Sequence, residues 1–510
     1  MDKLPPELVH QIVDIVRGPP RPLKHGQYCS CRKCRRPRPK LAPYTTLSRT
    51  WQAVIERIIW QDINLNTHDC FIRLKEYTSP GDSNSRHPHY CRDRVSYIRS
   101  LTWAWYRRDP HDSESEELPE WYDQTFHASL VELFDLLHSW NSIRPQKEMR
   151  LSLWLGRGAF ISRSHLPEKI RPSPADLATL SADQLWHGRR MGHQVHLSAS
   201  AVQDLPIIPY ITAFGFDNAD DAGASPSVFL GLMSRFPNVK RVYGGEGDGV
   251  PRGASKALAD QRQVFVDYLP YIPSSVEVFK YKIDYKREMS FNPAHNAANY
   301  LSRQGLDELS IGLRTLSMRL CRLKLKYVRI SGALFWPGEA EAVDTAGLYW
   351  PRLEELLIKE VPPYTADGEW IIDHDPDKWY NNSDVSLEDD PDQDWEYESG
   401  YYADREPIKH HAANKLYTAM GYAVQRMPRL RLLDFCFRAE VGEGGPKEVL
   451  TFKRDLNTGK AVLELSSHGG LQVAEEVLGA WKINEAGEEM VKEMKGWGGG
   501  RAEFEKWPPV

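Results

Sequence analysis

The sequence predicts a mixed fold, α+β or α/β in class, with a short helical unit at the N-terminus and an irregular array of helix–strand units after it. Apolar residues recur at helical spacing within the first 65 residues. Past residue 90, a proline followed by an extended apolar stretch recurs along the chain. Near the C-terminus, two apolar stretches flank a turn, which predicts that the array ends in a β-hairpin and a helix.

The N-terminal unit, residues 1–65, contains two amphipathic helical segments. Leu8, Ile12 and Val16 recur with helical spacing behind a pair of prolines, which cost no hydrogen bond at a helix start. A second series with the same spacing consists of Leu47, Trp51, Val54, Ile55 and Ile58. Helices this short cannot bury their apolar faces between themselves, so we expect the unit to contact a partner.

This unit resembles an F-box. The likeness rests on the three stretches Leu4-Pro5-Pro6-Glu7-Leu8, Leu47-Ser48-Arg49-Thr50-Trp51 and Trp60-Gln61-Asp62-Ile63. The sequence departs from the family in one way, because a basic, cysteine-containing insert, residues 18–40, separates the two helical halves. The resemblance implies that the helices bind a Skp-type adaptor and, through it, a cullin. The adaptor-binding residues that it implies are Leu4, Pro5, Leu8, Ile12, Leu47, Trp51 and Ile55.

Two roles are expected within this set of residues. Pro5 and Leu8 are expected to contact the adaptor directly, because the Leu-Pro opening lies outside the helix pair. Trp51 is expected to be an internal wedge, because a large aromatic side chain in mid-helix is usually buried. The alternative to an F-box is a generic helical hairpin that caps a larger domain.

Beyond residue 90, the recurring unit is a helix, a proline that ends it, and a short strand. Proline stops a helix and biases the residue before it toward extended geometry. The clearest copies start at Ile208-Pro209, Phe236-Pro237, Trp350-Pro351 and Met427-Pro428. One such unit has too little surface to close a core, so neighbouring units must stack, as in a leucine-rich-repeat-like array. The irregular spacing leaves a single irregular α/β domain as the alternative.

The chain therefore divides into four parts. They are the helical unit over residues 1–65, the repeat-like region over 90–320, the C-terminal part of the array over 321–484, and a tail over 485–510. Residues 449–452 and 461–465 are expected to form the hairpin, and a helix that contains Trp481 follows it. The tail, which begins near a run of three glycines, is expected to be flexible.

The third part, residues 321–484, resembles an uncharacterised C-terminal domain that follows F-boxes in filamentous fungal proteins. The residues that carry this likeness are Trp336-Pro337, Trp350-Pro351-Arg352-Leu353, Asp367-Gly368-Glu369-Trp370 and Met427-Pro428-Arg429-Leu430-Arg431. This second resemblance implies no activity, and the two resemblances together cover less than half of the chain.

Charge and hydropathy limit the classes of partner. The chain has 65 Lys and Arg against 70 Asp and Glu, and a net charge of −5 makes no general case for nucleic-acid binding. Two segments are strongly biased, since residues 17–40 contain nine basic residues and no acid, and residues 373–404 contain twelve acids and one lysine. Both are predicted to be solvated insertions. No apolar stretch can span a bilayer and no signal peptide is readable, so we expect a cytoplasmic or nuclear protein that does not bind membranes.

Cys29, Cys31 and Cys34 are the only tight cysteine cluster in the sequence. Thiolates at this spacing can share a zinc ion, with His25, Cys70, Cys91 or His87 as the fourth ligand. The alternative is a set of surface thiols on the basic insert, because a second Cys-x-x-Cys pair is missing. No other cofactor is expected.

The sequence contains no catalytic constellation, and the leading hypothesis is a non-enzymatic protein. It is the substrate-recognition subunit of a Skp–cullin–F-box ubiquitin ligase, with a protein target bound on the strand face between about residues 205 and 440. The loops expected to contact the target are residues 243–252 and 370–405. The alternative is an enzyme, a hydrolase or a metal-dependent one, with a site around Asp373, His374 and Asp375.

Overall fold

The computed structural model describes the chain in segments. They are residues 5–17, 48–79, 94–105, 118–143, 150–157, 197–216, 225–246, 255–283, 298–338, 341, 345–369, 371, 408–437, 448–467, 470–485 and 499–508.

Within these segments, twelve strands form one mixed sheet whose strand order follows the order of the chain from β1 to β12. The strands are β1 Asp62–Leu65, β2 Ser100–Trp105, β3 Leu151–Arg157, β4 Ile211–Phe216, β5 Arg241–Glu246, β6 Val278–Ile283, β7 Arg322–Lys326, β8 Glu355–Val361, β9 Leu432–Phe437, β10 Val449–Arg454, β11 Ala461–Ser466 and β12 Gly499–Phe504. Neighbouring strands are parallel from β1 to β9 and antiparallel from β9 to β12. The predicted mixed α/β class is therefore confirmed.

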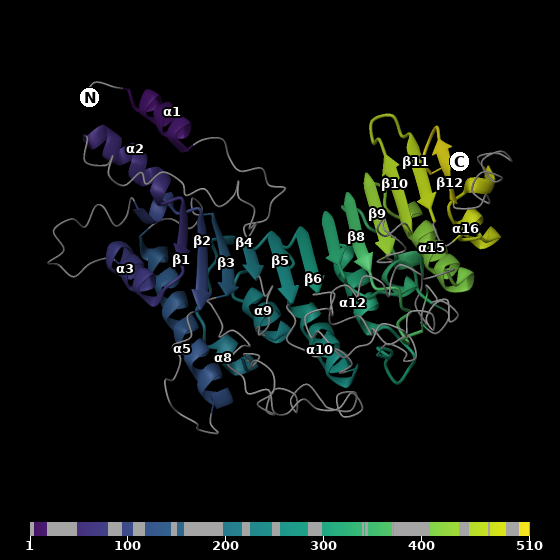
Figure 1. Ribbon diagram of the computed structural model, residues 1–510, viewed down its shortest axis with the longest axis horizontal. Helices are drawn as coiled ribbons and strands as arrows, with labels where there is room; N and C mark the ends of the chain where they lie inside the picture. The colour runs from purple at the N-terminus through teal and green to yellow at the C-terminus, as the bar shows by residue number, and fades with distance from the viewer. Residues whose placement is uncertain are drawn as a thin grey trace, which may run out of the picture.

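The helices of the array lie between the strands in sequence. They are α3 His68–Thr78, α5 Leu118–Ser139, α8 Ala199–Gln203, α9 Pro226–Met233, α10 Ser255–Tyr268, α12 Glu308–Ser317, α15 His410–Gln425 and α16 Glu475–Ala480. Figure 1 shows the strands as one curved row, with α5, α8, α9, α10 and α12 gathered on the same side of it. The N-terminal pair, α1 Pro6–Arg17 and α2 Arg49–Ile59, projects from the β1 end of the row.

Local sequence signals explain where the elements begin and end. Ser225 caps α9 with its hydroxyl, which accepts a hydrogen bond from the N–H of Ser227, and Pro226 occupies the first helical position. Pro237 then ends this unit, and β5 follows four residues later. The strands predicted after the prolines at 209, 237, 351 and 428 are all present, as β4, β5, β8 and β9.

A repeated backbone hydrogen bond joins successive units just before their strands. The N–H of Glu277 donates to the carbonyl of Lys240 at 2.8 Å, and the N–H of Cys321 donates to that of Glu277 at 2.7 Å. In the same way, the N–H of Glu354 donates to the carbonyl of Cys321 at 2.8 Å, and the N–H of Arg431 donates to the carbonyl of Glu354 at 2.9 Å. Each unit is therefore held in the same register on the unit before it.

One apolar core runs along the helix-covered face of the sheet, from Leu65 in β1 to Trp507 after β12. Aromatic rings fill its middle. The ring of Phe214 in β4 lies 5.6 Å from that of Phe229 in α9, and Phe265 in α10 lies 4.4 Å from Tyr281 in β6. The core is continuous because each unit buries its apolar residues against its neighbours.

Two strands, β1 and β12, lie in segments that were expected to belong to the helical unit and to a flexible tail. β1 pairs with β2 as the first strand of the sheet, so the last residues of the unit expected over residues 1–65 belong to the sheet. The expected flexible tail over 485–510 is wrong for residues 499–508. β12 pairs with β11, and Trp507 is only 2 % exposed, because Ala502 and Phe504 point into the same core. The alternation of these apolar residues outweighs the glycines that precede them.

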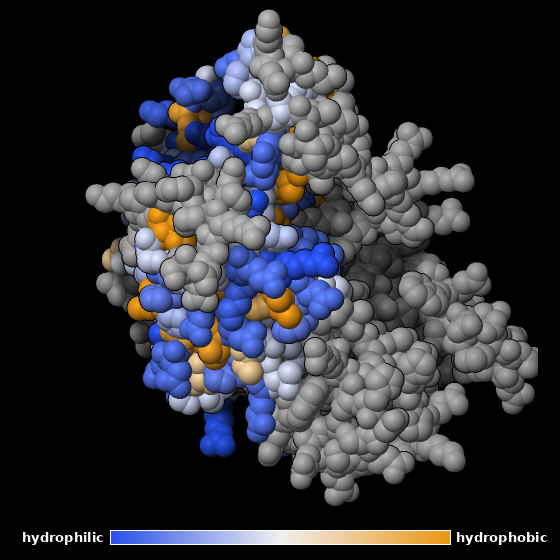
Figure 2. Space-filling model, turned by 90° about the vertical axis from the view of Figure 1, so that its left-hand side faces the viewer, coloured by the Kyte–Doolittle hydropathy of each residue, from blue (hydrophilic) through white to orange (hydrophobic). Residues whose placement is uncertain are grey.

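The polar β1 end closes the array on the N-terminal side. Figure 2 views this end, and hydrophilic residues dominate its coloured surface, with apolar residues in separate spots. Asp62 and Asn64 of β1 are exposed, as are the charged residues of α3. A polar edge strand of this kind resists pairing with another sheet.

Candidate functional site

The helix pair α1–α2 has a small core of its own. Val9 of α1 packs with Trp51, Ile55 and Ile58 of α2, and all four side chains are buried. Ser48 begins α2 as its N-cap, because its hydroxyl accepts a hydrogen bond from the N–H of Trp51 at 3.3 Å. The expected burial of Trp51 is confirmed, since its side chain is 7 % exposed.

The predicted adaptor-binding residues separate into two groups. Trp51 and Ile55 are buried in the helix-pair core, whereas Leu8 is 43 % exposed and Ile12 is 37 % exposed. Pro5 is exposed, and its carbonyl starts α1 by accepting the N–H groups of residues 8 and 9 at 3.0 and 3.2 Å. Leu4 and Leu47 lie outside the described residues.

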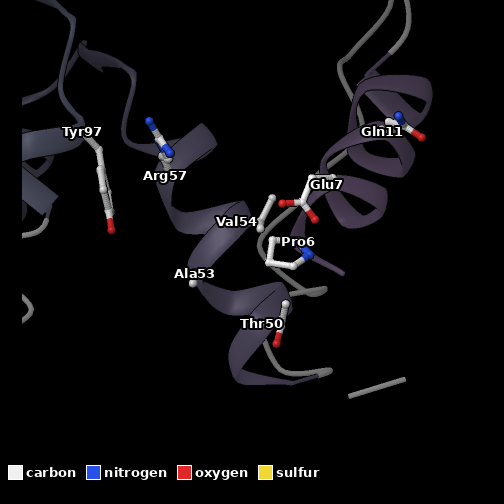
Figure 3. Close-up of a pocket in the computed structure, with 8 residues that line it drawn as sticks. All are labelled: Pro6, Glu7, Gln11, Thr50, Ala53, Val54, Arg57 and Tyr97. Atoms are coloured by element: carbon white, nitrogen blue, oxygen red, sulfur yellow. The ribbon is translucent and has the colours of Figure 1, made fainter. Parts of the chain in front are cut away.

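A groove of about 820 Å³ runs beside α2. Its lining consists of Pro6, Glu7, Gln11, Thr50, Ala53, Val54, Arg57 and Tyr97. In Figure 3, the residues of α1 lie on one side of α2 and Tyr97 lies on the other. The lining therefore combines the apolar side chains of Pro6 and Val54 with the charged side chains of Glu7 and Arg57.

Most residues of this groove were not among the predicted site residues. The α2 residues Thr50, Val54 and Arg57 are three or four residues apart, so helical spacing could have placed them on one face. Tyr97 gives no such signal, because only the fold brings the segment before β2 close to α2.

Short connections hold the helix pair on the array. Only Trp60 and Gln61 separate α2 from β1, and the carbonyl of Gln61 accepts the N–H groups of residues 99 and 100, each at 2.9 Å. Arg94 adds an ion pair to Glu56 at 3.5 Å, and its guanidinium lies 5.4 Å from the ring centroid of Trp60. The direction of α2 relative to the sheet is therefore set by several contacts.

The second candidate surface is the sheet face opposite the covering helices. Along β5–β8, the side chains that alternate with the buried ones are mostly basic, and we call this surface the basic face. Its basic residues are Arg241, Lys280, Lys282, Arg322, Lys324, Lys326 and Lys359, and Glu355 adds a carboxylate among them. It lies within the range of residues in which the target was predicted to bind.

An aromatic pair borders the basic face on the β5 side. The rings of Trp154 in β3 and Tyr243 in β5 stack, with centroids 5.2 Å apart and planes at 30°. Gly215 of β4 lies between them in the sheet, and a Cβ there would collide with the indole of Trp154. The ammonium of Lys280 lies 4.8 Å from the centroid of Tyr243. The missing side chain at Gly215 thus lets the two rings meet across β4.

The predicted contact loops are only partly described. Residues 243–246 belong to β5 and are not a loop, because they continue the pairing with β6 as far as Ile283. Residues 247–252 lie outside the described residues, and so does nearly all of the segment 370–405.

The remaining predicted sites mostly lie outside the described residues. This holds for Cys29, Cys31 and Cys34, for the alternative enzymatic site at Asp373, His374 and Asp375, and for three of the four proposed fourth ligands, His25, Cys91 and His87. Cys70 is described, and it is exposed near the start of α3. No group of three or more His, Cys, Asp or Glu that could hold a metal ion occurs in the described segments.

None of the described helices is both long enough and apolar enough to cross a membrane. Comparison with known proteins finds no matching family model, no matching curated protein and no matching solved structure.

Proposed function

We propose that this chain is the substrate-recognition subunit of a Skp–cullin–F-box ubiquitin ligase in the cytoplasm or nucleus, and that it performs no chemistry itself. The helix pair binds a Skp-type adaptor, a cullin joins through the adaptor, and the array holds a protein target. The observation that carries the proposal is the exposure of Leu8 and Ile12 on a helix pair that already has its own core.

Leu8 and Ile12 are four residues apart in α1, so they lie on the same face of the helix, one turn from each other. Single exposed apolar side chains are ordinary on a protein surface, but a pair one turn apart on one helical face is the pattern by which an amphipathic helix docks on a partner. Burial of these two side chains against an adaptor would remove the apolar surface that the small helix-pair core cannot cover.

The array supports the second half of the proposal. Its parallel strands are neighbours in chain order, and the described helices α5, α8, α9, α10 and α12 lie on one side of them, which we interpret as a divergent leucine-rich-repeat arrangement. Such an array leaves a broad strand face for a target. Because α2 leads into β1 through two residues, a bound target would stand in a fixed direction from the adaptor.

This arrangement would act through proximity. Holding a target near the ubiquitin-conjugating enzyme raises the effective concentration of the target's lysines at the thioester. No catalytic group is needed in this chain.

Affinity capture tests the proposal. The tagged chain, expressed in the cell from which it derives, should recover a Skp adaptor and a cullin by mass spectrometry. The double variant Leu8→Glu/Ile12→Glu should lose both proteins, because two carboxylates would face an apolar surface. The matched control is Ile72→Glu/Ile207→Glu, which alters two apolar residues of similar exposure, 41 % and 51 %, outside the helix pair.

The control variant should recover adaptor and cullin at the level of the unaltered chain. Recovery of both proteins by the Leu8/Ile12 variant would refute the assignment of this face to the adaptor, and absence of both from the unaltered chain would refute the ligase itself.

A further inference from the structure

The basic face places like charges directly opposite one another on neighbouring strands. Lys280 of β6 is paired in register with Lys324 of β7, and Lys282 is paired with Lys326. Lys326 is in turn opposite Lys359 of β8. Like charges at directly opposite positions destabilise a sheet, so this arrangement opposes folding in the absence of a counter-charge.

Carboxylates within the fold neutralise only part of this charge. Arg322 pairs with Glu355, Lys359 pairs with Asp434, and Lys326 pairs with Glu360 at 3.0 Å. In the described part of the chain, the basic residues of this face that form no ion pair are Arg241, Lys280, Lys282 and Lys324. Among the described residues, the ammonium of Lys280 lies 4.8 Å from the ring centroid of Tyr243, and that of Lys282 lies 5.8 Å from the ring centroid of Tyr327; the carboxylate of Glu355 also acts on Lys280 and raises its pKa.

The repulsion between the basic side chains is clearest in the pKa of Lys280. Partial burial lowers the pKa of its ammonium group, and the positive charges of Lys324 and Arg322 lower this pKa further. An anion at this position would reverse the second effect, because an opposite charge favours the protonated form of lysine.

We propose that the basic face binds an extended, carboxylate-rich segment of a partner protein, with Lys280, Lys282 and Lys324 as its central contacts. The proposal rests on the proposed function in one respect, since it names the chemical class of the target. Binding to the face itself requires neither the adaptor nor the cullin.

The spacing of the lysines fits acidic side chains on an extended chain. Lys280 and Lys282 are two residues apart in one strand, roughly 6.7 Å, which is also the repeat between alternate side chains of an extended peptide. Lys280 and Lys324 are one strand spacing apart, about 4.8 Å. Asp or Glu at alternate positions of a bound segment would therefore meet successive lysines.

Two observations favour carboxylates over nucleic acid or phosphate. The basic face is bordered by Asp434 and Glu360 and spans only four strands, roughly 15 Å, so it offers no long positive track for a nucleic-acid backbone. Bidentate arginine is the group most suited to phosphate, and of the two arginines of the face Arg322 is paired with Glu355, while Arg241 lies in β5, the first strand of the face. Lysines act as separate point charges, which suits separate carboxylates.

The test is a binding titration at low salt in which fluorescence anisotropy measures the binding of a labelled peptide to the protein. The probe is a labelled twelve-residue peptide that alternates Glu and Ser, and the same peptide with Gln in place of Glu is the neutral comparison. The Glu peptide should bind, more weakly as salt is added, and the Gln peptide should not. Lys280→Gln/Lys324→Gln should weaken binding about tenfold or more, because two charged contacts are lost.

The matched control is Lys453→Gln/Lys460→Gln, which removes the same charge at two exposed lysines of the β10–β11 hairpin region. This control should retain the affinity of the unaltered chain. The Lys280/Lys324 variant should also melt no lower than the unaltered chain, because a repulsive pair has been removed. An equal loss of affinity in both variants would overturn the proposal, as would equal binding of the Gln peptide.

Two further probes decide between sources of negative charge. A single-stranded oligonucleotide or a phosphoserine peptide that bound about ten times more tightly than the Glu peptide, and lost this binding in the Lys280/Lys324 variant, would overturn the choice of carboxylates. The Leu8/Ile12 variant described above should bind the Glu peptide normally, and the Lys280/Lys324 variant should still capture the adaptor. Failure of the peptide arm thus leaves the ligase proposal intact, and failure of adaptor capture leaves the peptide site intact.

Discussion

Trp51 offers a test that separates the folding of the helix pair from its exposed face. Its side chain is the largest of the four buried residues in the helix-pair core, and it is 7 % exposed. Its indole N–H has no hydrogen-bond partner among the described residues, so the loss on truncation is one of packing alone. Replacement by alanine should cost about 3–5 kcal/mol, the usual range for a buried tryptophan.

The core around Trp51 is too small to remain folded after a loss of stability of this size. The remaining buried side chains are Val9, Ile55 and Ile58, and each contributes about 1.5–3 kcal/mol before the entropy of ordering two short helices is subtracted. Trp51→Ala should therefore unfold α1 and α2 locally while the array stays folded, because the array has a separate, continuous core.

Amide hydrogen exchange measured by mass spectrometry distinguishes the two regions. Peptides over residues 49–59 should lose protection in Trp51→Ala, peptides over β6–β8 should keep it, and adaptor capture should fail. Ile59→Ala is the matched control, because Ile59 lies in the same helix and is 36 % exposed. If Trp51→Ala keeps both the protection of α2 and the capture of adaptor, the packing of Trp51 does not stabilise the helix pair.

Three more outcomes are expected. Asp307→Asn should lower stability by about 3–5 kcal/mol at neutral pH, because the buried guanidinium of Arg262 loses the carboxylate that it contacts at 2.7 Å; urea unfolding against the unaltered chain measures this. Burial would raise the pKa of Asp307, but Arg262 and the hydrogen bond from Ser310 lower it overall, so the stabilisation is present above the ordinary value of 3.8 and is lost as pH falls through the lower folded-state pKa. In Asp307→Asn this acid-dependent loss should be absent, and an unchanged pH profile would contradict the assignment. Removal of residues 499–510 should lower the melting temperature of the array, since it uncovers β11 and removes Trp507; an unchanged melting curve would mean that β12 contributes nothing. Deletion of residues 382–400 should leave the melting temperature unchanged, because so acidic a segment has little apolar surface to bury, and unfolding would show that it is structural.

Local patterns in the sequence were sufficient to predict most of the elements. A proline cannot continue a helix and biases the residue before it toward extended geometry, which is a local effect, and β4, β5, β8 and β9 begin two to four residues after Pro209, Pro237, Pro351 and Pro428. The hairpin β10–β11 was predicted for a similar reason, since its turn and its alternating residues are adjacent in the chain. The burial of Trp51 followed from its place in an apolar helical series.

Only the tertiary structure decided which of these elements share a surface. β12 begins within a run of three glycines and is a strand because β11 offers an edge to pair with and the core has room for Trp507. In the sequence, each lysine of β6 and β7 has the pattern of an ordinary solvated residue in a strand that alternates polar and apolar side chains. It is the register between strands more than 40 residues apart that brings Lys280 opposite Lys324. The same holds for Arg262 and Asp307, 45 residues apart, because the electrostatic energy of a pair depends on distance and burial, and neither is encoded in spacing along the chain.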